Sequence, residues 1–200
     1  MKLKDLDTGK AYTYDDYYSW DFEERVELIK GRVFEVNPIT YTIHQEIVGN
    51  IFTAFKTALN QKDNKVFIGP LDVRLPDNGL LSDKDISTVL QPDICVICDL
   101  TKIDKRGCIG APDLVVEVLS PGNSAKELKN KYKVYEEAGV KEYWVVSPQN
   151  QNFLIYTLQE GKFQLSPVKM PGDIITSAVL PGFSLDLAEL FKDIDSEEAS

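Results

Sequence analysis

The stretch Pro112-Asp-Leu-Val-Val-Glu-Val-Leu-Ser-Pro121 constrains the fold of this chain more than any other feature. It is a short apolar run between two prolines, which predicts a buried strand in the middle of a sheet. Because side chains alternate along a strand, Glu117 shares one face with Val115 and Leu119. A carboxylate among apolar residues is costly unless something neutralises it. The stretch therefore predicts a strand with a chemical role as well as a structural one.

A second apolar strand is predicted over residues 89–97. It contains another acid, Asp93, in the sequence Gln91-Pro92-Asp93, directly before the apolar residues 94–97. Carboxylate oxygens are the ligands that Mg²⁺ and Mn²⁺ prefer. We therefore expect Asp93 and Glu117 to hold one of these cations. With a lysine nearby to orient a water or stabilise charge, such a site suits metal-assisted hydrolysis of a phosphodiester. The alternative is a pair of edge carboxylates that are solvated or bound to the backbone.

The elements around Glu117 predict an α/β (α+β) fold. The Glu117 strand, a helix that starts near Asn123 or Ser124 and ends at Ala138, and a strand at residues 142–146 form a predicted crossover unit. This unit implies a central mixed sheet with helices on its faces. A helix over residues 42–59, an N-terminal hairpin around Gly31 and a C-terminal β extension at residues 153–167 complete the prediction. We expect one domain, residues 1–200, with its core at about 41–147.

Composition limits the functions that the chain can have. The net charge of −10 argues against non-specific binding to nucleic acid, which needs a basic surface. No apolar run approaches the roughly 20 residues that span a bilayer, and the first residues lack the apolar core of a signal peptide. We therefore expect a cytoplasmic protein without a membrane segment.

Other polar residues are weaker candidates for the site. Glu27 lies in the N-terminal hairpin, where a solvent-facing position is expected. His44, the single histidine, lies on or beside the buried stripe of the 42–59 helix, either as a core or capping residue or as part of the site. Asp72 is a further candidate from a predicted strand at 66–75, which Gly69-Pro70 interrupts. Asp113 shares a face with Glu117 but lies four residues away, about 13 Å at strand rise, and is expected to be structural.

Several phrases of this sequence together resemble a known family. They are Glu27-Leu28-Ile29-Lys30-Gly31-Arg32, His44, Gln91-Pro92-Asp93, Pro112–Pro121, Lys131 with Tyr135, Gly139-Val140-Lys141-Glu142-Tyr143-Trp144 and Leu180-Pro181-Gly182-Phe183. The chain resembles the restriction-endonuclease-like superfamily named for its PD-(D/E)xK motif and, more closely, the bacterial Uma-two family of proposed endonucleases. The resemblance implies a nuclease-like fold, a divalent metal and a DNA substrate.

The chain departs from the superfamily pattern at Leu119, where a lysine is expected two residues after the acid. The resemblance implies that Lys131, from the following helix, replaces it, and that Glu27 and His44 complete the site. Lys129 is a weaker candidate on another side of that helix. A surface ion pair between Lys131 and Glu127 is the alternative.

The leading hypothesis is a Mg²⁺- or Mn²⁺-dependent DNA endonuclease with Asp93, Glu117 and Lys131 as catalytic residues. A catalytically inactive nuclease fold that binds a partner is one alternative, and a hydrolase of a small phosphorylated substrate is another. Endonucleases that cut both strands often act as dimers, so a homodimer is one assembly that this chain could form. No segment of the sequence identifies an interface.

Overall fold

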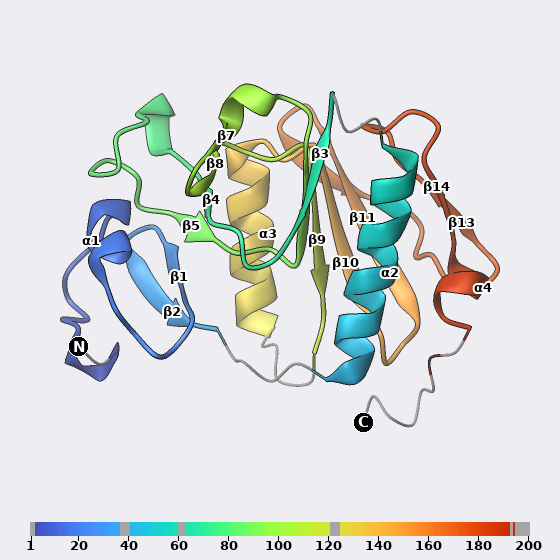
Figure 1. Cartoon of the computed structure of the whole chain (residues 1–200), viewed down its shortest axis with the longest axis horizontal. Coiled ribbons are helices and arrows are strands. Elements are labelled where there is room, and N and C mark those ends of the chain that lie inside the picture. The colour runs from blue at the N-terminus through green and yellow to red at the C-terminus, as the bar shows by residue number, and fades with distance from the viewer. Residues whose placement is uncertain (1–2, 37–40, 60–62, 121–124, 193, 195–200) are drawn as a thin grey trace.

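The strand that carries Glu117 lies at the centre of a six-stranded mixed sheet, which we call the main sheet. The computed structural model describes residues 3–36, 41–59, 63–120, 125–192 and 194 (Figure 1). In the main sheet, β9 (Leu114–Val118) pairs antiparallel with β6 (Ile94–Ile97) and parallel with β10 (Glu142–Ser147). The strand order is β12-β11-β10-β9-β6-β3, with outer strands β3 (Lys65–Ile68), β11 (Asn152–Gln159) and β12 (Lys162–Leu165).

Two helices cover opposite faces of the main sheet, α2 (Thr42–Ala58) and α3 (Ala125–Ala138) (Figure 1). The alternation predicted for the Glu117 strand is confirmed. Its even-numbered residues join one buried cluster with the apolar stripe of α2: Leu114, Val116, Val118, Ile47, Ile51 and Phe55. On the other face, Val115 clusters with Val134 and Tyr135 of α3. The predicted crossover unit is therefore present as β9, α3 and β10.

The start predicted for α3 at Asn123 or Ser124 lies outside the described residues. Its end is confirmed, because Ala138 is the last helical residue and Gly139 follows with φ +87°, a conformation that glycine adopts without strain. The helix over 42–59 is also confirmed, with Leu59 as its C-terminal cap.

A second six-stranded sheet was not predicted. Its order is β2-β1-β5-β4-β8-β7, and its strands are only two to four residues long: β1 (Val26–Ile29), β2 (Arg32–Glu35), β4 (Val73–Arg74), β5 (Val89–Leu90), β7 (Ile103–Asp104) and β8 (Gly107–Ile109). The predicted hairpin forms its β1–β2 pair. Lys30 (φ +49°) and Gly31 (φ +76°) both lie in the left-handed region, as a two-residue type I′ turn requires.

Two of the crossings between the two sheets divide segments that were each predicted as one strand. The single strands predicted at 66–75 and 89–97 are each divided: β3 and β6 belong to the main sheet, β4 and β5 to the second. Each break contains a proline, which has no N–H to donate to a ladder: Pro70 in one and Pro92 in the other. Asp72 and Asp93 lie on these crossings, so the breaks bring the candidate residues to the junction of the sheets.

The C-terminal β extension is present. Strands β11 and β12 form the predicted hairpin and widen the main sheet. A separate two-stranded sheet, β13 (Ile174–Thr176) with β14 (Ser184–Asp186), leads into α4 (Leu187–Leu190), and its side chains join the cluster under α2.

The remaining helical elements are short. They are α1 (Tyr14–Ser19) and three 3₁₀ turns at Leu3–Asp5, Asp77–Gly79 and Leu100–Lys102. None of the helices in the described residues combines the length and the apolar character that a membrane crossing requires.

Candidate metal centre and active site

Asp93 and Glu117 meet at the junction of the two sheets. In the β6–β9 pair, Ile94 lies opposite Val116, so the same register continued by one residue places Asp93 opposite Glu117. Residues directly opposite in an antiparallel pair project from the same face with their Cβ atoms about 5 Å apart. The backbone N–H of Val118 donates to Asp93 Oδ2 at 2.8 Å and fixes this carboxylate beside the Glu117 strand. The two acids singled out from the sequence therefore lie near each other.

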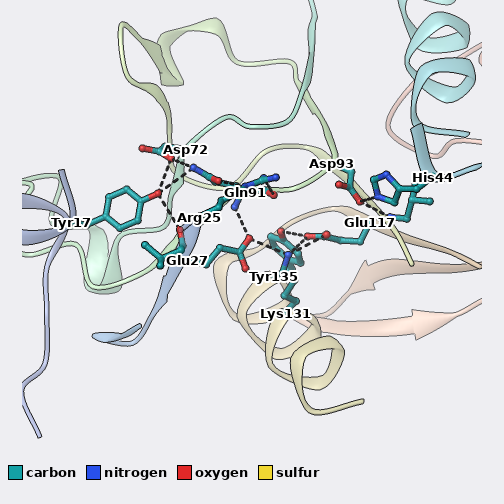
Figure 2. A network of polar contacts seen from close by, with 12 residues as sticks. Tyr17, Arg25, Glu27, His44, Asp72, Gln91, Asp93, Glu117, Lys131 and Tyr135 are labelled. Carbon is teal, nitrogen blue, oxygen red and sulfur yellow. Dashed lines mark hydrogen bonds and ion pairs between the residues drawn. The ribbon is translucent and has the colours of Figure 1, made fainter. Parts of the chain in front are cut away.

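Glu117 is buried and receives hydrogen bonds from two side chains of α3. Lys131 Nζ lies 3.0 Å from Oε1 and 3.1 Å from Oε2, and the Tyr135 hydroxyl donates to Oε1 at 2.8 Å (Figure 2). Lys131 and Tyr135 are four residues apart, so they project from the same face of the helix. Lys131 is 5% exposed, so its interpretation as part of a surface ion pair is wrong. The side chain of Glu127, the proposed partner, lies outside the described part of the chain.

Glu27 is buried, contrary to the solvent-facing position expected for it. Its side chain is only 2% exposed, because β1 lies between β2 and β5 in the second sheet. Glu27 Oε1 lies 3.0 Å from Lys131 Nζ and accepts the backbone N–H of Gln91 at 2.8 Å. The Lys131 ammonium is thus shared between two buried carboxylates, one from each sheet. Lys129, the weaker candidate, is exposed on α3.

The cluster contains more negative than positive groups. Burial raises the pKa of Glu117, the Lys131 ammonium opposes this effect, and the nearby Asp93 and Glu27 carboxylates raise the pKa further. Burial also works against the charge of Lys131, but its two carboxylate neighbours outweigh burial and raise its pKa. Lys131 therefore remains an ammonium, and Glu117 lies in a field that favours an additional cation.

His44 lies at the start of α2 and faces Asp93. Its Nε2 atom is 3.3 Å from Asp93 Oδ2, and the ring is buried. Among the described residues, its Nδ1 atom has no hydrogen-bond partner. The first turn of this helix thus reaches the acidic strands, which favours the interpretation of His44 as part of the site.

Asp72, in contrast, does not reach Glu117. Its carboxylate accepts hydrogen bonds from Tyr14, Tyr17 and the side-chain amide of Gln91 at 2.8–3.3 Å. Arg25 in turn donates to the side-chain and backbone oxygens of Gln91. Figure 2 shows this group on the far side of Glu27 from Glu117. Asp72 therefore supports Gln91, which was not singled out as a site residue from the sequence.

Asp113 is held away from the site, as expected. It accepts the Cys98 backbone N–H at 2.7 Å and pairs with Lys141 at 2.7 Å. Its two partners lie on the loop after β6 and just before β10, so its role is to tie strand ends together.

The donor set suits a hard divalent cation. Asp93 and Glu117 are near enough for the charge of one to act on the other, and with Glu27 the acids of the cluster outnumber Lys131. Within the described residues, no group of three or more His, Cys, Asp or Glu side chains is arranged so that it could hold a metal ion. Two carboxylates with the remaining positions left to water and substrate phosphate are the usual arrangement for Mg²⁺. The residues present therefore fit such an ion.

Comparison with known proteins identifies the family and supports the fold of this chain. The chain matches the model of the Uma2 family, described as "Putative restriction endonuclease", over residues 14–188. It is also similar in structure to a protein of Anabaena variabilis ATCC 29413 described as a putative nuclease belonging to DUF820, with a TM-score of 0.71 and 19% identity, over 90% of this chain and 98% of that one. A search of curated proteins found no match. The match over residues 14–188 shows that the chain belongs to the Uma2 family of putative restriction endonucleases.

Proposed function

We propose that this protein is a DNA endonuclease that uses Mg²⁺ or Mn²⁺ held by Asp93 and Glu117. The observation that carries the proposal is the buried Glu117–Lys131 ion pair with the half-buried Asp93 carboxylate beside it. The family description and the fold of the structural neighbour support a nuclease. The bound ion would polarise the phosphate and lower the pKa of a water molecule.

Other residues of the site position the two proposed ligands and supply a positive charge. Asp93 is held by the Val118 N–H and by His44, so its position is fixed before any ligand arrives. The Tyr135 hydroxyl fixes the orientation of the Glu117 carboxylate. Lys131 presents its ammonium beside Glu117, where it can orient the attacking water and stabilise the charge that develops on the phosphate.

DNA cleavage tests the proposal. Supercoiled plasmid and single-stranded DNA would be incubated with the protein and Mg²⁺ or Mn²⁺, beside the variants Glu117→Gln and Asp93→Asn. We expect metal-dependent cleavage that falls by at least about 100-fold in both variants, since each removes a negatively charged ligand.

Asp113→Asn is the matched control, because it alters a buried acid outside the site. It should leave cleavage unchanged. Undiminished cleavage by Glu117→Gln would contradict the proposed site. Activity of the wild-type protein on nucleotides or small phosphodiesters but on no DNA would contradict the proposed substrate.

A further inference from the structure

The Lys131 ammonium lies between two carboxylates that come from different sheets. Its Nζ atom is 3.0 Å from Glu27 Oε1 and 3.0 Å from Glu117 Oε1. All three side chains are buried, so neither ion pair is weakened by solvent. Lys131 is therefore the internal counter-ion of Glu117, and Glu27 is a second acceptor of the same ammonium.

A divalent ion on Glu117 would compete with this ammonium for the carboxylate oxygens. Removal of Lys131 from both acids would leave a buried charge without a partner, which is strongly unfavourable. Glu27 prevents that outcome, because it can keep the ammonium when Glu117 turns to a metal.

We propose that Glu27 is a positioning residue that holds Lys131 beside the metal site and so frees Glu117 to bind the ion. This inference rests on the proposed metal site at Asp93 and Glu117. In this role Glu27 contacts Lys131 and does not contact the metal, so it is not an additional metal ligand.

The surroundings of Glu27 support this assignment. Its Oε1 atom already accepts the Gln91 N–H, and Gln91 is held in turn by Arg25 and Asp72. The carboxylate is therefore fixed in the second sheet, and Figure 2 shows Lys131 between it and Glu117. A fixed acceptor on the side of Lys131 away from Asp93 keeps the ammonium near the reacting groups.

A double-mutant cycle on Mn²⁺ affinity tests the inference. Calorimetric titrations with Mn²⁺ would be made on the wild type, Glu27→Gln, Lys131→Met and the double variant. We expect Glu27→Gln to weaken Mn²⁺ binding by about 10–100-fold in the wild-type background, the range typical of residues that orient a metal site without touching the ion. In the Lys131→Met background, the same substitution should cause no loss.

Equal losses in both backgrounds would overturn the inference, because Glu27 would then act on the metal directly. No loss in the wild-type background would overturn it as well. Asp113→Asn is the matched control, since it removes a buried carboxylate from another lysine, Lys141, and should leave Mn²⁺ affinity unchanged.

A second measurement covers the case in which Lys131→Met does not fold. A crystal of the wild type soaked in Mn²⁺ should show an anomalous peak at Glu117, with Lys131 still within hydrogen-bonding distance of Glu27. A peak on Glu27 would overturn the inference. Failure of the metal site itself has a different signature, because Asp93→Asn and Glu117→Gln would then bind Mn²⁺ as the wild type does. That result would overturn both proposals.

Discussion

Two buried tyrosines on the α3 side of the main sheet provide a matched test of how Glu117 is oriented. Tyr135 and Tyr143 pack against each other with ring centroids 5.1 Å apart, and both are at most 1% exposed. The Tyr135 hydroxyl donates to Glu117 Oε1 at 2.8 Å. The Tyr143 hydroxyl has no hydrogen-bond partner among the described residues. Replacement of either tyrosine by phenylalanine removes one oxygen atom, but only one replacement removes a contact with the site.

We predict that Tyr135→Phe weakens Mn²⁺ binding by about 10-fold or more. A hydrogen bond to a charged group contributes about 1.5–3 kcal/mol, and about 1.4 kcal/mol corresponds to a factor of 10 in affinity. We base the expected loss on the lower end of this range, because Lys131 continues to hold the Glu117 carboxylate in the variant. Tyr143→Phe should leave the Mn²⁺ affinity unchanged and should not destabilise the protein, because it removes an unpaired buried hydroxyl.

The assay is calorimetric titration with Mn²⁺ of the wild type and both variants, with urea unfolding followed by circular dichroism to confirm the fold. Equal Mn²⁺ affinities of Tyr135→Phe and the wild type would refute the argument that this hydroxyl positions Glu117. A loss of affinity of the same size in Tyr143→Phe would show that packing, and not the hydrogen bond, is responsible.

Three further predictions concern acids that the structure separates by role. Asp72→Asn should change Mn²⁺ affinity by less than about threefold in the same titration, because Asp72 acts through Gln91, which Arg25 continues to hold in the variant. A loss of about 10-fold or more would contradict this placement. Burial opposes the charge of Asp113, but its hydrogen bonds with Lys141 and a backbone N–H outweigh burial and lower its pKa. The stabilising contribution of Asp113 should therefore be present at neutral pH and be lost as the pH falls below about 4. Urea unfolding of Asp113→Asn and the wild type should therefore differ at pH 6, and the difference should shrink as the pH falls below about 4. A difference that does not change with pH would refute the mechanism. Glu142→Ala should lower the free energy of unfolding by about 3 kcal/mol or more. The substitution leaves the Trp144 indole N–H, the Ser177 hydroxyl and the Ala178 N–H without their buried acceptor. A loss below about 1 kcal/mol would show that these donors find other partners.

The sequence predicted the main sheet because its strands are long enough to show their pattern. The alternation around Glu117 and the apolar stripe of residues 42–59 each predicted the correct element and the correct buried face. Apart from the predicted β1–β2 hairpin, the second sheet gave no such signal, since its other strands are only two or three residues long, too short to establish a period of two. Its formation depends on pairing between distant segments.

The same limit applies to the site. Asp93 and Glu117 could be singled out because each is an acid within or directly before an apolar run. The burial of Glu27 could not be predicted, because its partner Lys131 is distant in sequence and belongs to a different element. Tyr135 had a usable signal, its spacing of four residues from Lys131 on one helix, but that spacing gains meaning only when the helix faces Glu117.

Metal binding tests the central claim most directly, because it needs no knowledge of the substrate. The measurement is calorimetric titration of Mn²⁺ into the wild type and Glu117→Gln near neutral pH. The account predicts saturable binding to the wild type that is lost in the variant, since Glu117 supplies one of the two ligand carboxylates. Saturable binding of equal strength to both proteins would contradict it, because the metal would then lie elsewhere.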